Sequence, residues 1–313
     1  MIPQFPEFKK IEITDQEEVT NFTKNYPVYS DFNFISLFCW DTDDRRQFSM
    51  LNNNLVVRLT DDISGKEFFS FLGNNQVPET IRSIFKYAKK QNIRPILRMI
   101  PQETINFCSA EELRVEIKED RDNFDYVYSV NEIASLEGGK YSRQRRLAKR
   151  FESQYGDSCE VKVVELNDSA ELSVITNVWE KWNSVRESYS KREEKALLKL
   201  LKYVDNFNLI SIVVFVQEKP IAFMIAQICN ESTAVSHFGK ADYHFTGVFS
   251  FLMREASKKL RERNCDLLNL EEDLGLGQIR LMKEQYRPIS FMRKYSLEQK
   301  TGVLQWLKSM IQY

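Results

Sequence analysis

Predicted strands and helices follow the same order twice along the chain, and this repetition limits the fold more than any other feature of the sequence. The first half predicts strands at 47–51, 55–59 and 67–72, a helix from Pro78, a strand at 94–100, a helix at 101–108 and strands at 113–117 and 126–130. The second half predicts a strand at 161–166, helices at 169–186 and 191–203, a hairpin at 209–228 and a strand at 233–238. A long helix follows, with Phe249, Leu252, Met253, Ala256 and Leu260 on its inner face, and then a strand at 266–270, a helix at 279–285 and a strand at 289–296. Both halves contain three strands, a helix, a strand, a helix and a strand in that order. This shared order indicates a structural duplication, although two unrelated mixed domains could share it by coincidence.

The length of the chain supports the same division. A chain of 313 residues is longer than a single hydrophobic core comfortably serves. We therefore predict an α/β protein of the mixed α+β kind with two domains, residues 1–155 and 156–313. Each domain is expected to have a central mixed sheet flanked by helices, and a short helix is expected over 303–311.

Composition excludes several classes of protein. The 44 basic and 45 acidic residues nearly cancel, so the chain lacks the basic surplus of a generic nucleic-acid binder. The cysteines are odd in number, scattered and never in a CxxC pair: Cys39, Cys108, Cys159, Cys229 and Cys265. We therefore expect neither a zinc site nor a disulfide framework. With only two histidines, His237 and His244, we predict no metal site.

The apolar segments are too short for a membrane protein. The N-terminal residues MIPQFPEFKK lack the apolar core of a signal peptide. The longest apolar stretch, 209–216, is far shorter than the roughly 20 residues that span a bilayer. We expect a cytoplasmic protein with no transmembrane segment.

Four segments resemble one known family. They are SDFNF at 30–34 leading to Trp40, EDRDNFDY at 119–126, GKY at 139–141 with its basic continuation, and NLEEDLG at 269–275 followed by Lys283 and Tyr286. Together they are similar to the catalytic half of bacterial phosphatidylglycerol lysyltransferases, over nearly the whole chain. The resemblance implies two tandem GNAT-like (N-acetyltransferase-like) domains. It also implies a relationship to enzymes that move an aminoacyl group from aminoacyl-tRNA to a lipid or peptide acceptor.

The acidic segment is the first candidate for chemistry. Asn269, Glu271, Glu272 and Asp273 follow a predicted strand, at an edge where α/β folds tend to place active sites. Adjacent carboxylates can raise the pKa of one member and make it a general base. We predict Glu271, Glu272 and Asp273 as catalytic and Asn269 as a binding residue. The alternative is a charged loop that caps the next helix.

Three more residues are candidates in the same half. Tyr286 is a candidate proton donor to a leaving hydroxyl or thiolate, the role that a tyrosine often has in GNAT-like enzymes. Lys283 could hold a phosphate or an oxyanion, and Lys240 is a candidate cation just after its predicted strand. Lys283 and Tyr286 could equally be surface groups.

A basic stripe is the candidate contact for phosphates. Lys140, Arg143, Arg146 and Arg150 recur at i, i+3, i+6 and i+10, which places them on one helical face. Such a stripe can hold a nucleic-acid backbone or a nucleotide phosphate. A solvated helix face is the alternative.

The loop expected to bind coenzyme A lacks its usual glycines. GNAT enzymes cradle the pyrophosphate of acetyl-CoA with a Gly-rich turn before the central helix. The corresponding segment, 240–248, keeps one glycine, Gly247. Walker, dinucleotide and nucleophile-elbow motifs are also missing from the sequence.

Three functions remain open at this point. The leading hypothesis is an aminoacyl transferase that takes its donor from the acceptor end of an aminoacyl-tRNA. The transferred group would go to a small molecule, a peptide or a lipid headgroup with an amine or hydroxyl. The alternatives are an acyl-CoA-dependent N-acyltransferase and a non-catalytic binding protein on a GNAT scaffold.

Overall fold

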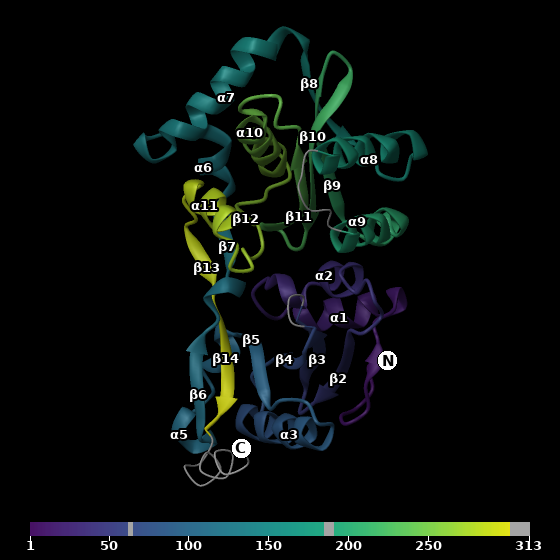
Figure 1. Cartoon of the computed structure of the whole chain (residues 1–313), viewed down its shortest axis with the longest axis vertical. Coiled ribbons are helices and arrows are strands. Elements are labelled where there is room, and N and C mark those ends of the chain that lie inside the picture. Colours follow the sequence, from purple (N-terminus) through teal and green to yellow (C-terminus); the bar gives the residue numbers. More distant parts are fainter. Residues whose placement is uncertain (62–64, 185–190, 301–313) are drawn as a thin grey trace, which may run out of the picture. The chain divides into compact units, whose positions relative to one another are not determined.

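The chain forms two compact units whose residues interleave along the sequence. The computed structural model describes residues 1–61, 65–184 and 191–300 (Figure 1). The first unit contains Met1–Pro27, Asp43–Asn123 and the described residues from Met292 onward, and the second contains Val28–Thr42 and Phe124–Phe291. The expected helix end at Arg186 and the expected helix over 303–311 lie outside the described residues.

The first unit is built on a seven-stranded mixed sheet with the strand order β1-β2-β3-β4-β5-β14-β6. Its strands are β1 (Lys9–Lys10), β2 (Gln47–Leu51), β3 (Asn54–Thr60), β4 (Glu67–Leu72), β5 (Ile96–Pro101), β14 (Lys294–Gln299) and β6 (Val115–Glu119). Its helices are α1 (Gln16–Thr23), α3 (Val77–Lys90), α4 (Gln102–Ile105) and α5 (Ala110–Leu113). Strands β4 and β5 are parallel, and α3 connects them. Ile81, Ile84 and Ala88 recur at helical spacing on α3 and are buried in the core of this unit.

The second unit has a seven-stranded sheet of the order β13-β7-β12-β11-β10-β9-β8. Its strands are β13 (Ser290–Met292), β7 (Asp125–Ser129), β12 (Leu267–Asn269), β11 (Thr233–Ala241), β10 (Lys219–Ile228), β9 (Leu209–Val216) and β8 (Cys159–Val164). Its helices are α2 (Phe34–Cys39), α6 (Val130–Ser135), α7 (Ser142–Tyr155), α8 (Ser169–Ser184), α9 (Lys191–Lys202), α10 (Val248–Arg261) and α11 (Gly277–Gln285). Strand β12 is parallel to β11, and α10 connects the two.

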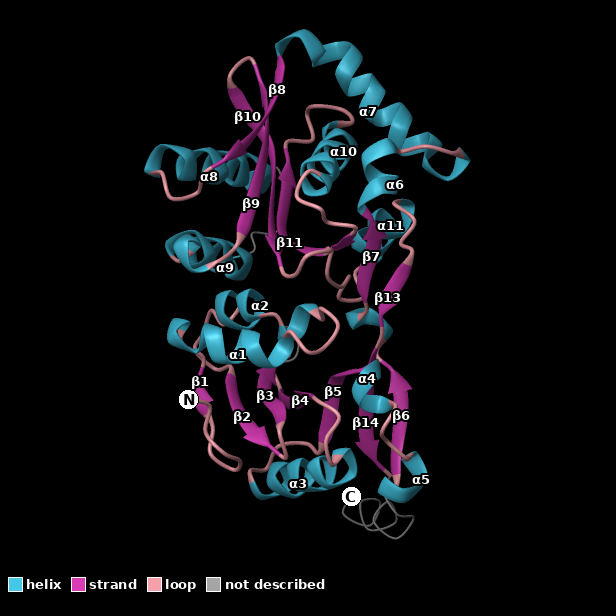
Figure 2. Ribbon diagram, turned by 180° about the vertical axis from the view of Figure 1, so that it is seen from behind, coloured by secondary structure: helices cyan, strands magenta, loops and turns pink. Residues whose placement is uncertain are grey.

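The two faces of this second sheet carry different helices. Along β10, Met224 and Ala226 belong to the apolar cluster that contains the buried residues of α10. Successive side chains of a strand point to opposite faces, so Gln227 points to the other face. Helix α8 packs against β10 and β11. Figure 2 shows α8 and α9 on one side of the sheet, with α6, α7 and α10 on the other.

The predicted duplication is visible in both sheets. In the first unit β2, β3 and β4 are antiparallel, and α3 leads to the parallel strand β5. In the second unit β9, β10 and β11 are antiparallel, and α10 leads to the parallel strand β12. The prediction of two central mixed sheets, each flanked by helices, is confirmed.

The division at 155/156 differs from the units that the structure forms, because the two halves exchange strands. Strand β7 comes from the first half of the sequence but pairs with β12. Strand β14 comes from the second half but pairs with β5 and β6. For the same reason, the single strand expected at 289–296 is two strands, β13 and β14, which belong to different sheets.

Candidate functional site

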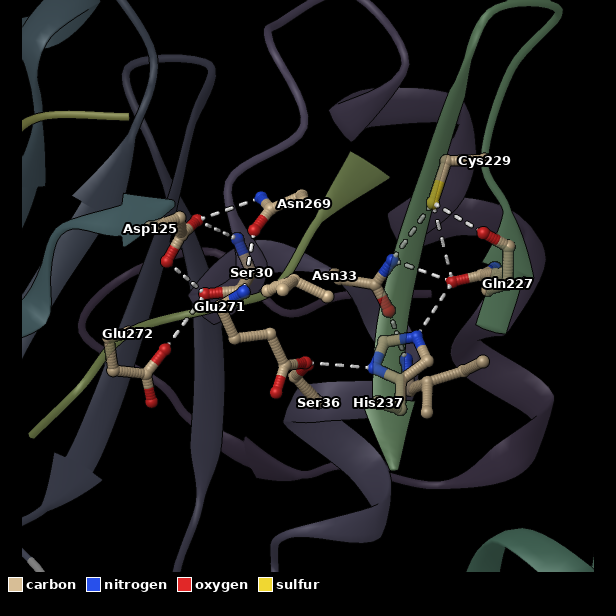
Figure 3. Close-up of polar contacts among 12 residues, drawn as sticks. Ser30, Asn33, Ser36, Asp125, Gln227, Cys229, His237, Asn269, Glu271 and Glu272 are labelled. Carbon is tan, nitrogen blue, oxygen red and sulfur yellow. Dashed lines mark hydrogen bonds and ion pairs between the residues drawn. The ribbon is translucent and has the colours of Figure 1, made fainter. Parts of the chain in front are cut away.

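A polar cluster gathers where β11 and β12 part in the second unit. Strand β12 ends at Asn269, opposite Val235, while β11 continues to Ala241. A bulge interrupts the β10–β11 pairing, since Ala226 faces Ser236 and Ile225 faces Phe238. His237 is the extra residue of this bulge. Bulges often re-aim a side chain beside an active site, and here the side chain of His237 points toward the loop that follows β12 (Figure 3).

Glu271 and His237 form the centre of the cluster. The Nδ1 atom of His237 lies 2.9 Å from Oε1 of Glu271, and Ser36 Oγ lies 3.4 Å from the same oxygen. A carboxylate only accepts hydrogen bonds, so Nδ1 carries the proton in this contact. Within the described part of the chain, the other oxygen of Glu271, Oε2, has no hydrogen-bond partner. The side chain of Glu271 is 17% exposed, so part of it is accessible to a ligand.

Amide side chains support the far side of the histidine. Nε2 of His237 lies 3.4 Å from Oε1 of Gln227. This oxygen accepts a hydrogen bond of 2.7 Å from Asn33, the residue immediately before α2. Asn33 also caps α2, because its side chain accepts from the backbone N–H of Ile35. Cys229 lies 3.5 Å from Asn33 Nδ2, and burial raises the pKa of its thiol to about 12. The raised pKa favours the thiol over the nucleophilic thiolate at neutral pH.

A second, more buried part of the cluster surrounds Asp125. Its carboxylate accepts from the backbone N–H of Ser30 at 2.8 Å, from the hydroxyl of Ser30 at 2.6 Å and from Asn269 Nδ2 at 3.2 Å. The same hydroxyl lies 3.2 Å from Glu272 Oε2. Asn269 Oδ1 accepts from the N–H of Glu271 at 2.7 Å. Asn269 thus links the strand end, Asp125 and the acidic loop.

Asp273 is enclosed within the protein. It is 0% exposed and forms a two-pronged ion pair with Arg280, at 2.8 and 2.9 Å. The hydroxyl of Tyr126 and the N–H of Gly275 also donate to it. Burial opposes ionisation, but these donors outweigh it and lower the pKa of Asp273. This geometry gives Asp273 a structural role, in place of the catalytic one predicted.

Lys283 fixes the backbone of the acidic loop. Its ammonium donates to three successive backbone carbonyls, those of Leu270, Glu271 and Glu272. Burial lowers the pKa of Lys283, while the surrounding carboxylates oppose that shift. All three protons of the ammonium are engaged, so Lys283 positions Glu271 and Glu272 and has no donor left for a phosphate.

The comparisons with known proteins agree with this fold. The family described as phosphatidylglycerol lysyltransferase, C-terminal, matches residues 24–298. The chain belongs to this family. No curated protein matches it.

Solved structures of the same fold cover nearly the whole chain. A conserved protein of unknown function from Bacteroides thetaiotaomicron is 24% identical, with a TM-score of 0.81 over 96% of this chain and 100% of that one. L-PGS from Bacillus licheniformis is 14% identical, with a TM-score of 0.63 over 99% and 98%. FemX is 10% identical, with a TM-score of 0.55 over 98% and 100%. The predicted resemblance and the tandem GNAT-like fold are confirmed.

Tyr286 does not join the acidic residues in this family member. Its hydroxyl lies 3.1 Å from Ser250 Oγ, within the apolar cluster on the α10 face of the sheet. Burial raises the pKa of Tyr286. The hydrogen bond to Ser250 of α10 is a structural contact, and Glu271 is bonded to groups of the opposite face.

The basic stripe also lies on the α10 side. Helix α7 carries Arg143, Arg146 and Arg150 as exposed side chains, and α7 packs on α10. Within the residues that the structure describes, these three arginines form no salt bridge. Lys140, by contrast, pairs with Glu132 at 2.7 Å.

Lys240 is already paired within the protein. Its ammonium lies 2.6 Å from Glu193 Oε1 and 3.9 Å from the ring centre of Trp182. Of the predicted residues, Asn269, Glu271, Glu272 and Lys283 come together in one cluster. Lys240 lies outside this cluster, against Glu193 and Trp182, and Tyr286 and the stripe lie on the α10 side.

Sequence reasoning missed the partners of the acidic loop. The predicted site residues did not include His237, Gln227 and Asp125. They also did not include Ser30, Asn33 and Ser36, which lie in α2 or just before it. A signal was present for two of these groups: SDFNF and EDRDNFDY were among the segments of the family resemblance, but neither was taken as part of the site.

Two further properties concern the described residues only. Over 1–61, 65–184 and 191–300, no group of three or more His, Cys, Asp or Glu side chains is arranged to hold a metal ion. Among the helices that the structure describes, none combines the length and apolar character needed to cross a membrane.

Proposed function

We propose that this chain transfers an aminoacyl group from an aminoacyl-tRNA to an amine or hydroxyl acceptor. The observation that carries the proposal is the carboxylate of Glu271. His237 and Ser36 hold one of its oxygens, and its other oxygen has no hydrogen-bond partner in the described chain. A carboxylate fixed in this way is suited to proton transfer.

The proposed reaction needs one group that takes a proton and returns it. The acceptor O–H or N–H attacks the carbonyl carbon of the aminoacyl ester, and its proton passes to Oε2 of Glu271. The bond between the carbonyl carbon and the ribose oxygen then breaks. The departing ribose oxygen takes the proton back from Glu271, so the carboxylate is regenerated and the charges balance.

The surrounding residues act by holding this carboxylate. His237 donates to Oε1 and so fixes the direction of Oε2. Lys283 and Asn269 fix the backbone of Glu271, through its carbonyl and its N–H. Glu272, whose Oε2 lies 3.2 Å from Ser30 Oγ, is placed to bind the ammonium of the aminoacyl group.

Phosphate contacts are proposed for the stripe on α7. Arg143 and Arg146 are exposed and lack salt-bridge partners in the described part of the chain. Exposed arginines without counter-charges suit a nucleic-acid backbone, which carries a negative charge at each phosphate. Lys140 contributes less, because Glu132 already neutralises it.

Aminoacyl-tRNA is favoured over acyl-CoA as the donor because of Gly247. A Cβ atom at this position would lie 2.2 Å from the carbonyl oxygen of Leu147 in α7. The single glycine of the β11–α10 loop therefore serves helix packing, and the loop lacks the further glycines that cradle a pyrophosphate.

The test compares donors on the purified chain. Binding is measured with mixed charged tRNA, with uncharged tRNA and with acetyl-CoA. Release of the labelled amino acid is followed with hydroxylamine as a simple amine acceptor, and the rate is taken as the excess over a reaction without protein, because hydroxylamine cleaves aminoacyl esters by itself. We expect binding of tRNA and amine-dependent release from charged tRNA. Binding of acetyl-CoA, with no release from charged tRNA, would overturn the proposal in favour of an acyl-CoA enzyme.

A further inference from the structure

A lysine of the protein itself occupies a cation-binding arrangement beside the site. The ammonium of Lys240 lies 3.9 Å from the ring centre of Trp182 and 5.5 Å from that of Trp179. It also forms an ion pair of 2.6 Å with Glu193 of α9. Aromatic faces together with a carboxylate are the groups with which proteins recognise an ammonium. Both tryptophans are buried, and the side chains of Lys240 and Glu193 are only 13% and 19% exposed.

This arrangement is continuous with the polar cluster around Glu271. Along β11, His237 contacts Glu271, Phe238 stacks on Trp40 with ring centres 5.9 Å apart, and Lys240 contacts Trp182. All these partners come from α2, α8 and α9 or from the loop after β12. Helices α2 and α9 also pack together, since Lys199 of α9 donates to the carbonyl of Asp41. The lysine therefore lies on the face of β11 that carries Glu271, three residues along the strand from His237.

An unpaired polar atom marks the same part of α8. The indole N–H of Trp179 is buried and has no hydrogen-bond partner in the described chain, and Trp179 is only 3% exposed. Asn183, one turn further along α8, has a buried Oδ1 atom without a partner. A donor and an acceptor left unpaired on one helix face are the groups that a polar ligand would satisfy.

We propose that Lys240 is a specificity-determining residue that fills a cation subsite and so excludes cationic aminoacyl side chains. The ammonium of a lysyl side chain that entered this subsite would contact the ring of Trp182 and the carboxylate of Glu193, and Lys240 already holds both. The aminoacyl group that this chain accepts is then one with an uncharged side chain. This inference rests on the proposed aminoacyl transfer for its biological meaning, and its test measures binding alone.

The experiment measures binding of two matched probes to the whole chain by calorimetry. L-lysinamide carries the side-chain ammonium, and L-norleucinamide has the same aliphatic side chain without it. For the unchanged protein we expect lysinamide to bind no more tightly than norleucinamide. For Lys240→Ala, which removes the lysine ammonium from Glu193 and Trp182, we expect at least a tenfold preference for lysinamide.

Two further variants test the cause of that preference. Lys240→Arg keeps a cation in the subsite and should show no gain for lysinamide. Glu193→Gln, added to Lys240→Ala, should remove the gain, because the carboxylate is gone. Thermal unfolding of each variant confirms that it is folded before binding is measured.

The inference is overturned if the unchanged protein already prefers lysinamide, if Lys240→Ala gains no preference, or if neither probe binds any variant. Failure of the proposed function is a separate result. If charged tRNA gives no transfer while Lys240→Ala gains lysinamide binding, the cation subsite stands and the proposed reaction falls.

Discussion

Glu271 has a left-handed backbone conformation, with a φ of 59°, and such a conformation is uncommon for a residue with a side chain. It costs on the order of 1–3 kcal/mol and persists only where its surroundings fix it. Here Asn269 accepts from its N–H, and Lys283 and the N–H of Tyr126 donate to its carbonyl. The strain falls on the residue that we propose as the proton carrier, which is where functional sites tend to hold it.

Asp273, two residues after Glu271, is the carboxylate whose loss should reduce the stability of the folded protein. In Asp273→Asn the buried carboxylate that pairs with Arg280 is lost, so we expect the free energy of unfolding to fall by roughly 2–4 kcal/mol. Urea unfolding of the purified variant measures this. Glu272→Gln is the matched control, since Glu272 is only partly buried, and it should change stability far less. Equal effects of the two substitutions would contradict the structural role of Asp273.

The same carboxylate predicts a dependence of stability on pH. The pKa of Asp273 is lower in the folded chain than its ordinary value of 3.8. Its contribution is therefore fully present above pH 3.8 and is lost as the pH falls below 3.8 toward the lowered pKa. Urea unfolding of the unchanged protein and of Asp273→Asn should differ most above this pH and converge below it. A difference that stays constant through this range would argue against the lowered pKa.

At the scale of elements, α7 and α10 meet at a point that admits no side chain. Gly247 has a φ of 89° and lies at the start of α10, against the carbonyl of Leu147. Gly247→Ala should reduce the free energy of unfolding by about 2 kcal/mol or more, because the backbone conformation and the helix contact both resist a Cβ. Gly139→Ala is the control, since a Cβ there meets nothing within 4 Å. Thermal unfolding of both variants tests this, and equal melting temperatures would refute it.

Local patterns were sufficient to predict several of the regular elements. The apolar residues of α3 and α10 recur at helical spacing, and both helices are found where that spacing places them. The break between β13 and β14 has no comparable local signal, because it arises from pairing with two different sheets. A single run of strand-forming residues was therefore read as one strand.

The site was less predictable than the fold for a related reason. The acidic loop can be recognised in the sequence by its three adjacent carboxylates, but the roles of these carboxylates depend on residues distant in the sequence. Ser36 and Glu271 are 235 residues apart, and Asp273 differs from Glu271 mainly because Arg280 and Tyr126 surround it. No local pattern distinguishes an acidic residue that turns inward from one that turns outward.

At the scale of the whole molecule, the exchange of β7 and β14 ties the two halves of the sequence together. Fragments 1–155 and 156–313 would each contain a strand that belongs to the other sheet, and each would lack the strand that its own sheet needs. We expect neither fragment alone to unfold cooperatively, and we expect co-expression to restore a folded complex. Urea unfolding followed by circular dichroism measures this. A cooperative transition for 156–313 alone would contradict the account.

The most direct test of the central claim measures single-turnover transfer from labelled charged tRNA. The rate of the Glu271→Gln variant is compared with that of the unchanged protein. Glutamine keeps the shape of the side chain but cannot carry the proton, so the rate should fall by about 10²–10⁴-fold while tRNA binding is unchanged. The control is Glu284→Gln, an exposed position on α11, which should keep the full rate. A Glu271→Gln variant that transfers at the rate of the unchanged protein would show that Glu271 is not the proton carrier.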